Sequence, residues 1–367
     1  MTDNTKAQSF TADFIAEGLD QTRGRFRSLH ILNHAITGNN AAKNIVVNGL
    51  ILAEDGKKMS KSLKNYPDPQ DLIQKRGGDS FRLYCLSSPV VRAEPMKFNE
   101  KGVEQAFKDF TIPLQNVFNF FETYAKIDQW KSDGTEVYFA TGKLEGEMLT
   151  RINPEITIEK YDLKIENPVD DYDKYFDIIE NNKGKRILIV GGGQGGVIEL
   201  PTYKISNDLD KWILAELHKM MIEVDTHLQN YILDEATKSA MDFMDKLTNR
   251  RLRRSRRRFW SNGMNEDKNS AFSTLFHVLK RYLQILAPFT PFITEYLWLK
   301  LADFEEKEEN QSIHLSSRPI ASKKYINQTL IDETAIIRKI IKLALFVRAK
   351  NKIAVKQPLQ TLQVKID

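Results

Sequence analysis

Apolar residues recur every three or four positions over long parts of the chain, which is the spacing of amphipathic helices. This spacing predicts a helix from about residue 23 to 36, and another over 102–124 that is kinked at Pro113. Between residues 207 and 298 it predicts four helices joined by short connections, which favours an antiparallel bundle. A further amphipathic helix is expected over 334–350.

A lysine-rich loop follows the first predicted strands. Residues 45–47 and 50–52 are apolar runs on either side of Asn48-Gly49, a dipeptide typical of tight turns, so we expect a two-stranded hairpin. With the preceding helix, these strands indicate an α/β unit. Beyond Gly56, lysines stand at positions 57, 58 and 61. Such a loop is either a solvated basic segment or a holder of phosphates, because lysine donors can follow a moving negative charge.

Residues 126–205 break the helical pattern. The elements predicted here are strands at 136–140, 156–161 and 186–190 and a helix at 172–179. The run at 186–190, which we expect to be a buried strand, leads into Gly191-Gly192-Gly193-Gln194-Gly195-Gly196. This string satisfies the G-x-G-x-x-G spacing and is similar to the glycine loop of S-adenosylmethionine-dependent aminopropyltransferases. Because Pro201 interrupts any long following helix and bundle sequence resumes by Leu209, we favour a structural lobe over a cofactor site.

Composition limits the classes of protein to consider. The chain of 367 residues has room for two or three domains, and 54 basic against 49 acidic residues leave a net charge of only +5. The one cysteine, Cys85, excludes an internal disulfide and a four-cysteine zinc site, and we interpret it as a core residue. The first residues carry no apolar signal core, and no apolar run reaches membrane-spanning length. We therefore expect a cytoplasmic chain without a membrane partner.

The lysine loop carries a resemblance to a known family. Lys58-Met59-Ser60-Lys61-Ser62 matches, letter for letter, the second signature of the class I aminoacyl-tRNA synthetases. Three more segments resemble the isoleucyl members of that family: 14–24 resembles the segment beside the aminoacyl-adenylate, 79–94 the strand-to-bundle connection, and 253–260 the anticodon-domain helix. The four segments occur in the family's order. The resemblance covers residues from about 10 to 125 and from 206 to 367.

The resemblance implies an ATP and adenylate site. Lys58 and Lys61 would hold the phosphates of ATP, which is used with Mg²⁺, while pyrophosphate leaves. The residues expected to bind ATP and isoleucyl-adenylate are Glu17, Gly18, Asp20, Gln21, Lys58, Met59, Ser60, Lys61 and Ser62. The family's first signature, His-x-Gly-His, and its editing domain are not found in this sequence. His30 and His34 lie four residues apart without that glycine or a third metal ligand, so we interpret them as ordinary helix residues.

An arginine-rich run lies within the predicted bundle. Seven arginines stand between Arg250 and Arg258, followed by Phe259-Trp260. A charged helix face is usually only solvated, but guanidinium groups also grip RNA phosphates and stack on unpaired bases. The resemblance favours binding of tRNA-Ile. The residues expected to contact it are Arg253, Arg254, Arg256, Arg257, Arg258, Phe259 and Trp260.

Four arginines depart from the family pattern. Arg25 and Arg27 stand where a tryptophan and a tyrosine are usual, and Arg250 and Arg251 replace an aromatic pair. An arginine in place of an aromatic packing residue leaves a buried charge or forces its segment outward. We therefore expect an altered adenylate pocket, and a bundle that keeps its attraction for phosphates while its base stacking is weakened.

These observations predict an α/β Rossmann-type partial catalytic core followed by an all-α anticodon-binding helical bundle with an α/β insertion. The expected boundaries are 1–98 for the core, 99–125 and 206–315 for the bundle, 126–205 for the insertion, and 316–367 for the start of a C-terminal region. The first hypothesis is part of an isoleucine–tRNA ligase, in which ATP activates isoleucine for transfer to tRNA-Ile. A separate chain would supply the N-terminal catalytic half, and this chain alone would not form isoleucyl-adenylate. The alternatives are a tRNA-binding fragment without catalysis and a nonfunctional fragment.

Overall fold

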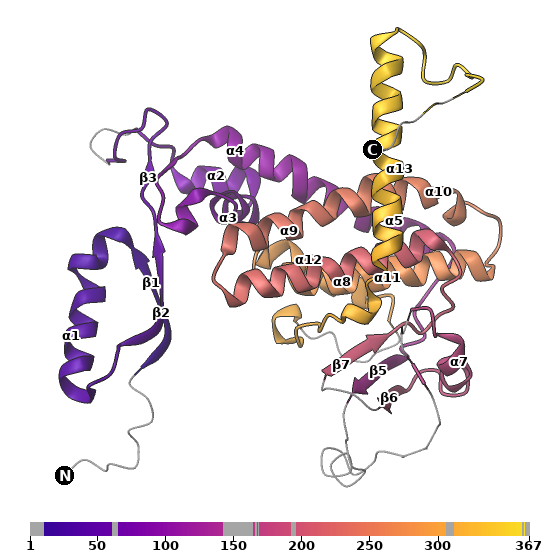
Figure 1. Ribbon diagram of the computed structural model, residues 1–367, viewed down its shortest axis with the longest axis horizontal. Helices are drawn as coiled ribbons and strands as arrows, with labels where there is room; N and C mark the ends of the chain where they lie inside the picture. The colour runs from indigo at the N-terminus through magenta and orange to yellow at the C-terminus, as the bar shows by residue number, and fades with distance from the viewer. Residues whose placement is uncertain are drawn as a thin grey trace.

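The computed structural model describes residues 11–60, 65–141, 164–165, 167, 169–191, 196–305, 312–361 and 363. A helical bundle occupies the centre of the molecule (Figure 1). A small α/β unit stands beside one end of it, and a small sheet lies against another face. The candidate functional residues lie in the α/β unit and in the bundle.

The N-terminal unit has the order strand, helix, strand, as an α/β unit requires. Strand β1 (Ala12–Gly18) leads through the 3₁₀ helix η2 (Leu19–Arg23) into α1 (Arg25–Thr37). Gly38 ends the helix with φ 73°, which glycine adopts without steric cost. Strand β2 (Ala42–Asn48) then runs parallel to β1. Because parallel strands place their carboxyl ends at one edge, Gly18 and Asn48 lie opposite each other at the edge from which the lysine loop departs.

The predicted hairpin at Asn48-Gly49 is wrong. Strand β3 (Ile51–Leu52) pairs in parallel with β4 (Met96–Lys97) and not with β2. Gly49 lacks the positive φ that a type I′ turn requires, and its N–H donates to the carbonyl of Val90 at 2.7 Å. A Cβ at Gly49 would overlap the backbone of Glu94. The glycine therefore serves a close approach of two backbones and not a turn.

Short helices connect this unit to the bundle. They are α2 (Pro69–Arg76), α3 (Gly78–Leu86), the 3₁₀ helix η3 (Pro89–Arg92) and α4 (Glu100–Ala106). They enclose a small core formed by Leu72, Val90, Met96, Phe98 and Val103. Half-buried Cys85 packs against this core, where burial raises the pKa of its thiol, as expected for a core cysteine.

The helix predicted over 102–124 is interrupted. The π-helical turn η4 (Phe107–Thr111) separates α4 from α5 (Ile112–Ile127). Pro113 has no N–H to donate and its ring crowds the preceding turn, so the helix widens just before it. The predicted kink therefore takes the form of a π turn.

The bundle contains the predicted helices. They are α8 (Asp208–Gln229), α9 (Leu233–Asp245), the π-helical η5 (Lys246–Leu252), α10 (Arg253–Phe259), α11 (Glu266–Leu286) and α12 (Pro291–Ala302). Its core is rich in aromatic side chains, with Phe121, Trp212, Phe243, Phe272 and Tyr282 completely or almost completely buried. Burying such large apolar surfaces stabilises the bundle as one packed unit.

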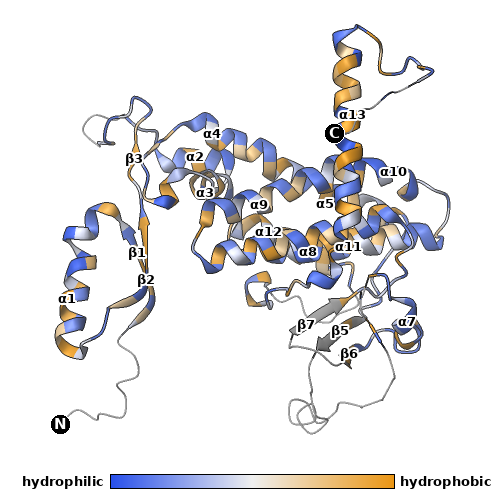
Figure 2. Ribbon diagram, viewed as in Figure 1, coloured by the Kyte–Doolittle hydropathy of each residue, from blue (hydrophilic) through white to orange (hydrophobic). Residues whose placement is uncertain are grey.

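Two elements near the C-terminus differ from expectation. Residues 312–315 form the 3₁₀ helix η6 (Ile313–Leu315) and not a strand, because Glu295 Oε2 accepts the N–H of Ile313 at 2.9 Å and fixes a turn. After the 3₁₀ helix η7 (Lys323–Tyr325), helix α13 (Gln328–Lys350) begins earlier than predicted, where the side chain of Asn327 accepts the Leu330 N–H. Helix α13 projects away from the bundle (Figure 1), and apolar residues occur along its projecting part (Figure 2).

The described residues within 126–205 form a lobe on the bundle. Strand β5 (Glu136–Thr141) lies between parallel β6 (Arg186–Gly191) and antiparallel β7 (Gly196–Leu200), with α7 (Asp173–Glu180) nearby. The strand predicted at 156–161 lies outside the described residues. The expectation that 186–190 is buried is wrong, because β6 is an edge strand on which Leu188 and Val190 are exposed.

The glycine string lacks the context that a dinucleotide site needs. Such a site requires a helix to begin at the last glycines, so that its N–H groups face the pyrophosphate. Here Gly196, the last glycine, begins strand β7. The lobe shares one hydrophobic core with the bundle, to which it contributes buried Val137, Tyr175 and Leu200. Within the described part of the chain, no helix is both long and apolar enough to cross a membrane.

Candidate adenylate pocket and RNA-binding face

The described part of the lysine loop is held by Asn65. The chain turns back at Gly56, whose φ is 81°, so that Lys58 forms a β-bridge with Leu52. The Asn65 side chain then binds two residues of the N-terminal arm of the loop: Oδ1 accepts the Ser60 N–H at 2.9 Å, and Nδ2 donates to the Lys58 carbonyl at 3.2 Å. Lys58 itself is exposed. Lys61 and Ser62 lie outside the described residues.

Met59 also anchors the loop. Its side chain packs against the small core that contains Leu72 and Phe98. Sequence reasoning placed Met59 and Ser60 among the ligand-binding residues, and the structure gives both of them contacts that shape the loop. Sequence reasoning missed Asn65, although an asparagine in the turn-forming string Asn65-Tyr66-Pro67-Asp68-Pro69 was a usable signal.

The four predicted pocket residues lie together at the carboxyl end of β1. Glu17 and Gly18 end the strand, and Asp20 and Gln21 lie in η2 directly after it. The carboxylate of Glu17 is partly buried, Gln21 is also partly buried, and Asp20 is exposed. Because β2 also ends here and leads toward the lysine loop, the topology brings the two predicted groups to the same edge.

Arg25 adopts the outward position that was one of the two expected consequences of losing an aromatic residue. It is the first residue of α1, and its guanidinium Nη1 lies 2.7 Å from Glu17 Oε1. Arg27 is also exposed. The two arginines therefore cause no buried charge. Instead, Arg25 adds a cation beside the carboxylate of the predicted pocket.

Six of the seven arginines in the run divide into an inner and an outer set. Arg251 is completely buried, and its Nη2 lies 2.6 Å from Oδ1 of Asp210, which is also completely buried. Arg258 donates to both oxygens of the same carboxylate at 3.0 and 2.8 Å, and to Asp267. Burial lowers the pKa of Arg251, whereas the bonds to Asp210 overcome burial and raise the pKa of Arg258. These two arginines hold the bundle together.

Two predicted RNA contacts are therefore wrong. Phe259 is 1% exposed and packs edge-on against Phe120 and Phe272, so it cannot stack on a base. Arg258 directs its guanidinium to carboxylates within the bundle. Sequence reasoning missed Asp210, the partner of Arg251 and Arg258, although a carboxylate on the apolar stripe of α8, three and four residues before Ile213 and Leu214, was a usable signal.

The outer set remains available to a ligand. Its members are Arg253, Arg254, Arg256 and Arg257, all exposed on α10, together with Trp260 at the end of this helix. Trp260 is 53% exposed, unlike its neighbour Phe259. An indole next to four guanidinium groups offers both phosphate attraction and base stacking.

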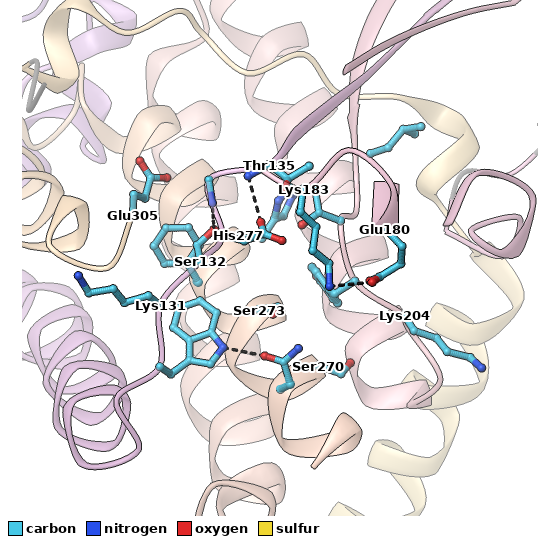
Figure 3. A pocket seen from close by; sticks show the side chains of 18 of the residues that line it. Lys131, Ser132, Thr135, Glu180, Lys183, Lys204, Ser270, Ser273, His277 and Glu305 are labelled. Carbon is cyan, nitrogen blue, oxygen red and sulfur yellow. Dashed lines mark hydrogen bonds and ion pairs between the residues drawn. The ribbon is translucent and has the colours of Figure 1, made fainter. Parts of the chain in front are cut away.

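A cavity of about 510 Å³ lies between the lobe and the bundle (Figure 3). Several of its charged side chains are paired: Lys183 with Glu180 at 2.7 Å, and Lys280 with Glu305. Burial lowers the pKa of His277 to about 4, so its imidazole is neutral near pH 7. None of the residues predicted to bind a ligand lines this cavity. We interpret it as a gap in the joint between the two parts.

Known families match both ends of the chain. The model of the class I tRNA synthetases for I, L, M and V matches residues 1–97, and the model of the anticodon-binding domain of tRNA ligase matches residues 210–366. A LeuRS of Agrobacterium radiobacter K84, solved in a ternary complex with tRNA and LeuAMS, shares the fold with a TM-score of 0.50 at 15% identity. The superposition covers 87% of this chain and 30% of that chain. The chain belongs to the class I aminoacyl-tRNA synthetases.

Within this class, similar curated relatives include isoleucine–tRNA ligases. The chain is 36% identical over 357 residues to the ligase of Protochlamydia amoebophila (strain UWE25), and 34% identical over 357 residues to that of Treponema denticola. Each alignment covers 97% of this chain, and only 28% and 27% of the respective relative. The chain thus spans just over a quarter of these relatives. Because the alignment runs through residues 126–205, the lobe belongs to the same matched stretch as the bundle, contrary to the sequence-based expectation that the resemblance skips it.

Proposed function

We propose that this chain forms part of an isoleucine–tRNA ligase, with the lysine loop and half of the adenylate pocket at its N-terminal end and a tRNA-binding face on the bundle. The observation that carries the proposal is the division of the arginine run. Arg251 and Arg258 form ion pairs with Asp210 inside the bundle. Four neighbouring arginines and Trp260, in contrast, are exposed on one short helix. Internal packing accounts for the first set, and a polyanionic partner accounts for the second.

The lysine loop fits the phosphates of ATP. Lys57 and Lys58 are exposed on a loop that Asn65 and Met59 hold in place, so their ammonium groups are presented without blocking carboxylates from the core. Lys57 makes only a 3.7 Å contact with Asp55, an exposed pair that solvent weakens. We propose that Lys58, with Lys61, stabilises the phosphates of ATP, and that Mg²⁺ arrives on those phosphates.

An exposed apolar surface on the α/β unit indicates that this unit binds a partner. In the described chain, α1 buries none of its residues, and Leu32, Ile36, Ile45 and Phe14 are each more than half exposed. Figure 2 shows apolar positions along this helix and the adjacent strands. Surfaces of this kind mark interfaces. We propose that the N-terminal half of the ligase's catalytic core covers this surface, either in a longer polypeptide or as a separate chain.

Binding of tRNA-Ile at low and moderate salt tests the main proposal. Replacing Arg253, Arg254, Arg256 and Arg257 by alanine should weaken binding and flatten its salt dependence by about 0.7 in log–log slope for each lost phosphate contact with single-stranded RNA. The matched control removes four positive charges elsewhere, by replacing exposed Lys101, Lys164, Lys174 and Lys185 with alanine. If both quadruple variants bind alike, only overall charge matters and the proposed face is contradicted.

A non-catalytic tRNA-binding role is the second candidate, because the Arg25 guanidinium pairs with the Glu17 carboxylate of the predicted pocket. Isoleucine-dependent pyrophosphate exchange separates the two roles. The chain alone should show none, while the chain combined with the N-terminal half of a ligase should show exchange that Lys58→Ala reduces by at least tenfold. Tight, selective binding of tRNA-Ile without exchange in the combined sample would favour the non-catalytic role.

A further inference from the structure

The polar groups at the carboxyl end of β1 bind one another. Arg25 Nη1 donates to Glu17 Oε1 at 2.7 Å, and the backbone N–H of Arg25 donates to Gln21 Oε1 at 3.2 Å. Gln21 Nε2 in turn donates to Asp20 Oδ2 at 2.9 Å. Three of the four predicted pocket residues are thus linked into a network whose only cation is Arg25.

Two glycines make this arrangement possible. A Cβ at Gly18 would lie 2.7 Å from Oδ1 of Asp20, and a Cβ at Gly24 would lie 2.5 Å from Oε1 of Gln21. Both distances are shorter than a carbon–oxygen contact allows, so the Asp20 and Gln21 side chains can fold back over the backbone only because these positions lack a side chain. The network is therefore shaped by the local sequence.

The two residues of the Arg25–Glu17 ion pair differ in how far their side chains are exposed. Glu17 belongs to the paired strand β1, and its side chain is 26% exposed, whereas the Arg25 side chain is 70% exposed. An exposed pair of this kind is weak, because water competes for both charges. The guanidinium can therefore leave the carboxylate by rotation of its own side chain, while the carboxylate stays in place.

We propose that Arg25 is an internal competitor at the amino-acid site. Its guanidinium neutralises Glu17 until the ammonium group of an amino acid takes its place, so Arg25 sets the affinity of this site for amino acids. The inference rests on the proposed function in one respect, namely that Glu17 receives the amino group of the substrate. Because an exposed pair contributes at most about 1 kcal/mol, the competition lowers amino-acid affinity by up to about fivefold.

Titration of the 367-residue chain, followed by NMR chemical shifts, tests this with two probes. L-isoleucine carries the ammonium group, and 3-methylpentanoic acid has the same side chain and carboxylate without it. The variant Arg25→Met keeps the length of the side chain and removes its charge. It should bind isoleucine up to about fivefold more tightly than the wild type and show no gain for 3-methylpentanoic acid. Arg27→Met is the matched control, an exposed arginine on the same helix, and should change neither affinity.

Three other outcomes would each contradict the inference, and they can be told apart. Unchanged isoleucine affinity in Arg25→Met would show that Arg25 does not compete. Weaker affinity would show that Arg25 holds the ligand, for instance through its carboxylate. If isoleucine affinity is the same in Glu17→Gln as in the wild type, Glu17 does not receive the amino group. In that case the adenylate pocket of the proposed function fails together with the inference, whereas the first two outcomes leave the proposed function intact.

Discussion

The carboxylate of Asp210 and the guanidinium of Arg251 form an ion pair at 2.6 Å in the interior of the helical bundle, where both residues are completely buried. Arg258 completes the site by binding the same carboxylate from α10. Arg251 also donates to the Ala271 carbonyl and bonds Ser255, so α8, η5, α10 and α11 are joined through one charged centre. This centre fixes which arginines of the run face outward.

Removing the buried charge of Asp210 should destabilise the bundle strongly. In Asp210→Asn, Arg251 keeps its buried positive charge without a counter-charge, and we expect a loss of about 3–5 kcal/mol in the free energy of unfolding. Urea unfolding measures this loss. Asp208→Asn, the same change at an exposed position at the start of α8, is the control and should change the free energy by less than about 0.5 kcal/mol.

The double variant Asp210→Leu with Arg251→Met tests the cause of that loss. Removing both charges leaves no unpaired buried ion, because Arg258 keeps its ion pair with Asp267, so most of the stability lost in Asp210→Asn should return. A double variant as unstable as Asp210→Asn would indicate that packing, and not the unpaired charge, is responsible.

Adding one methyl group at Gly49 should disturb the contact between the α/β unit and the segment before the bundle. A Cβ there overlaps the backbone of Glu94, and relieving the overlap by separating the two backbones stretches the bond from the Gly49 N–H to the Val90 carbonyl. We expect Gly49→Ala to cost about 1–3 kcal/mol in urea unfolding, as overpacking usually does. Asn48→Ala, at the exposed neighbouring residue, is the control, and an equal loss in both variants would contradict this account.

Asn65 should control the mobility of the lysine loop. In Asn65→Ala, the Ser60 N–H and the Lys58 carbonyl lose their shared partner, while Met59 keeps its contacts with the small core. We expect the Ser60 amide to exchange its hydrogen roughly tenfold faster, as the loss of about 1.4 kcal/mol of local stability implies. Gln70→Ala, at an exposed position in α2, should leave that rate unchanged. Equal protection of Ser60 in both variants would show that Asn65 does not hold the loop.

The bundle should lose stability in mild acid because of His218. Burial lowers the pKa of His218 to about 3, with a smaller effect from His277, and the ring stacks on Tyr325 at 4.1 Å. As the pH falls below about 6.5, His218 binds a proton in the unfolded chain but stays neutral in the folded chain. The free energy of unfolding therefore decreases. At pH 4 this contribution amounts to about 3 kcal/mol.

Urea unfolding between pH 7 and pH 4 measures the effect. His218→Phe keeps a ring against Tyr325 and removes the proton site, so its stability should fall less steeply over this range. His30→Phe, at an exposed histidine, should follow the wild-type curve. A wild-type slope in His218→Phe would assign the acid sensitivity to other groups, such as His277, whose pKa is also lowered.

The sequence determined the order and type of most elements. Helical periodicity located α1, α5, α8, α9, α11 and α13, because each buries or presents apolar residues every three or four positions. The string Lys58-Met59-Ser60 and the segment around Glu17 identified the family, because such motifs are local and contiguous. Alternation and turn residues also located β5 and β6.

Only the tertiary structure decided how these elements pair and which side chains remain free. Asn48-Gly49 resembles a turn locally, but the backbone that approaches Gly49 comes from Val90 and Glu94, far along the chain. The π turn at η5 shifts the helical phase, so that Arg251 and Arg258 bind Asp210 while Arg253, Arg254, Arg256 and Arg257 are exposed. In the same way, the position of Arg25 against Glu17 depends on how η2 joins β1 to α1. Pairing and burial are set by contacts between distant residues, and a local pattern of polar and apolar positions cannot specify them.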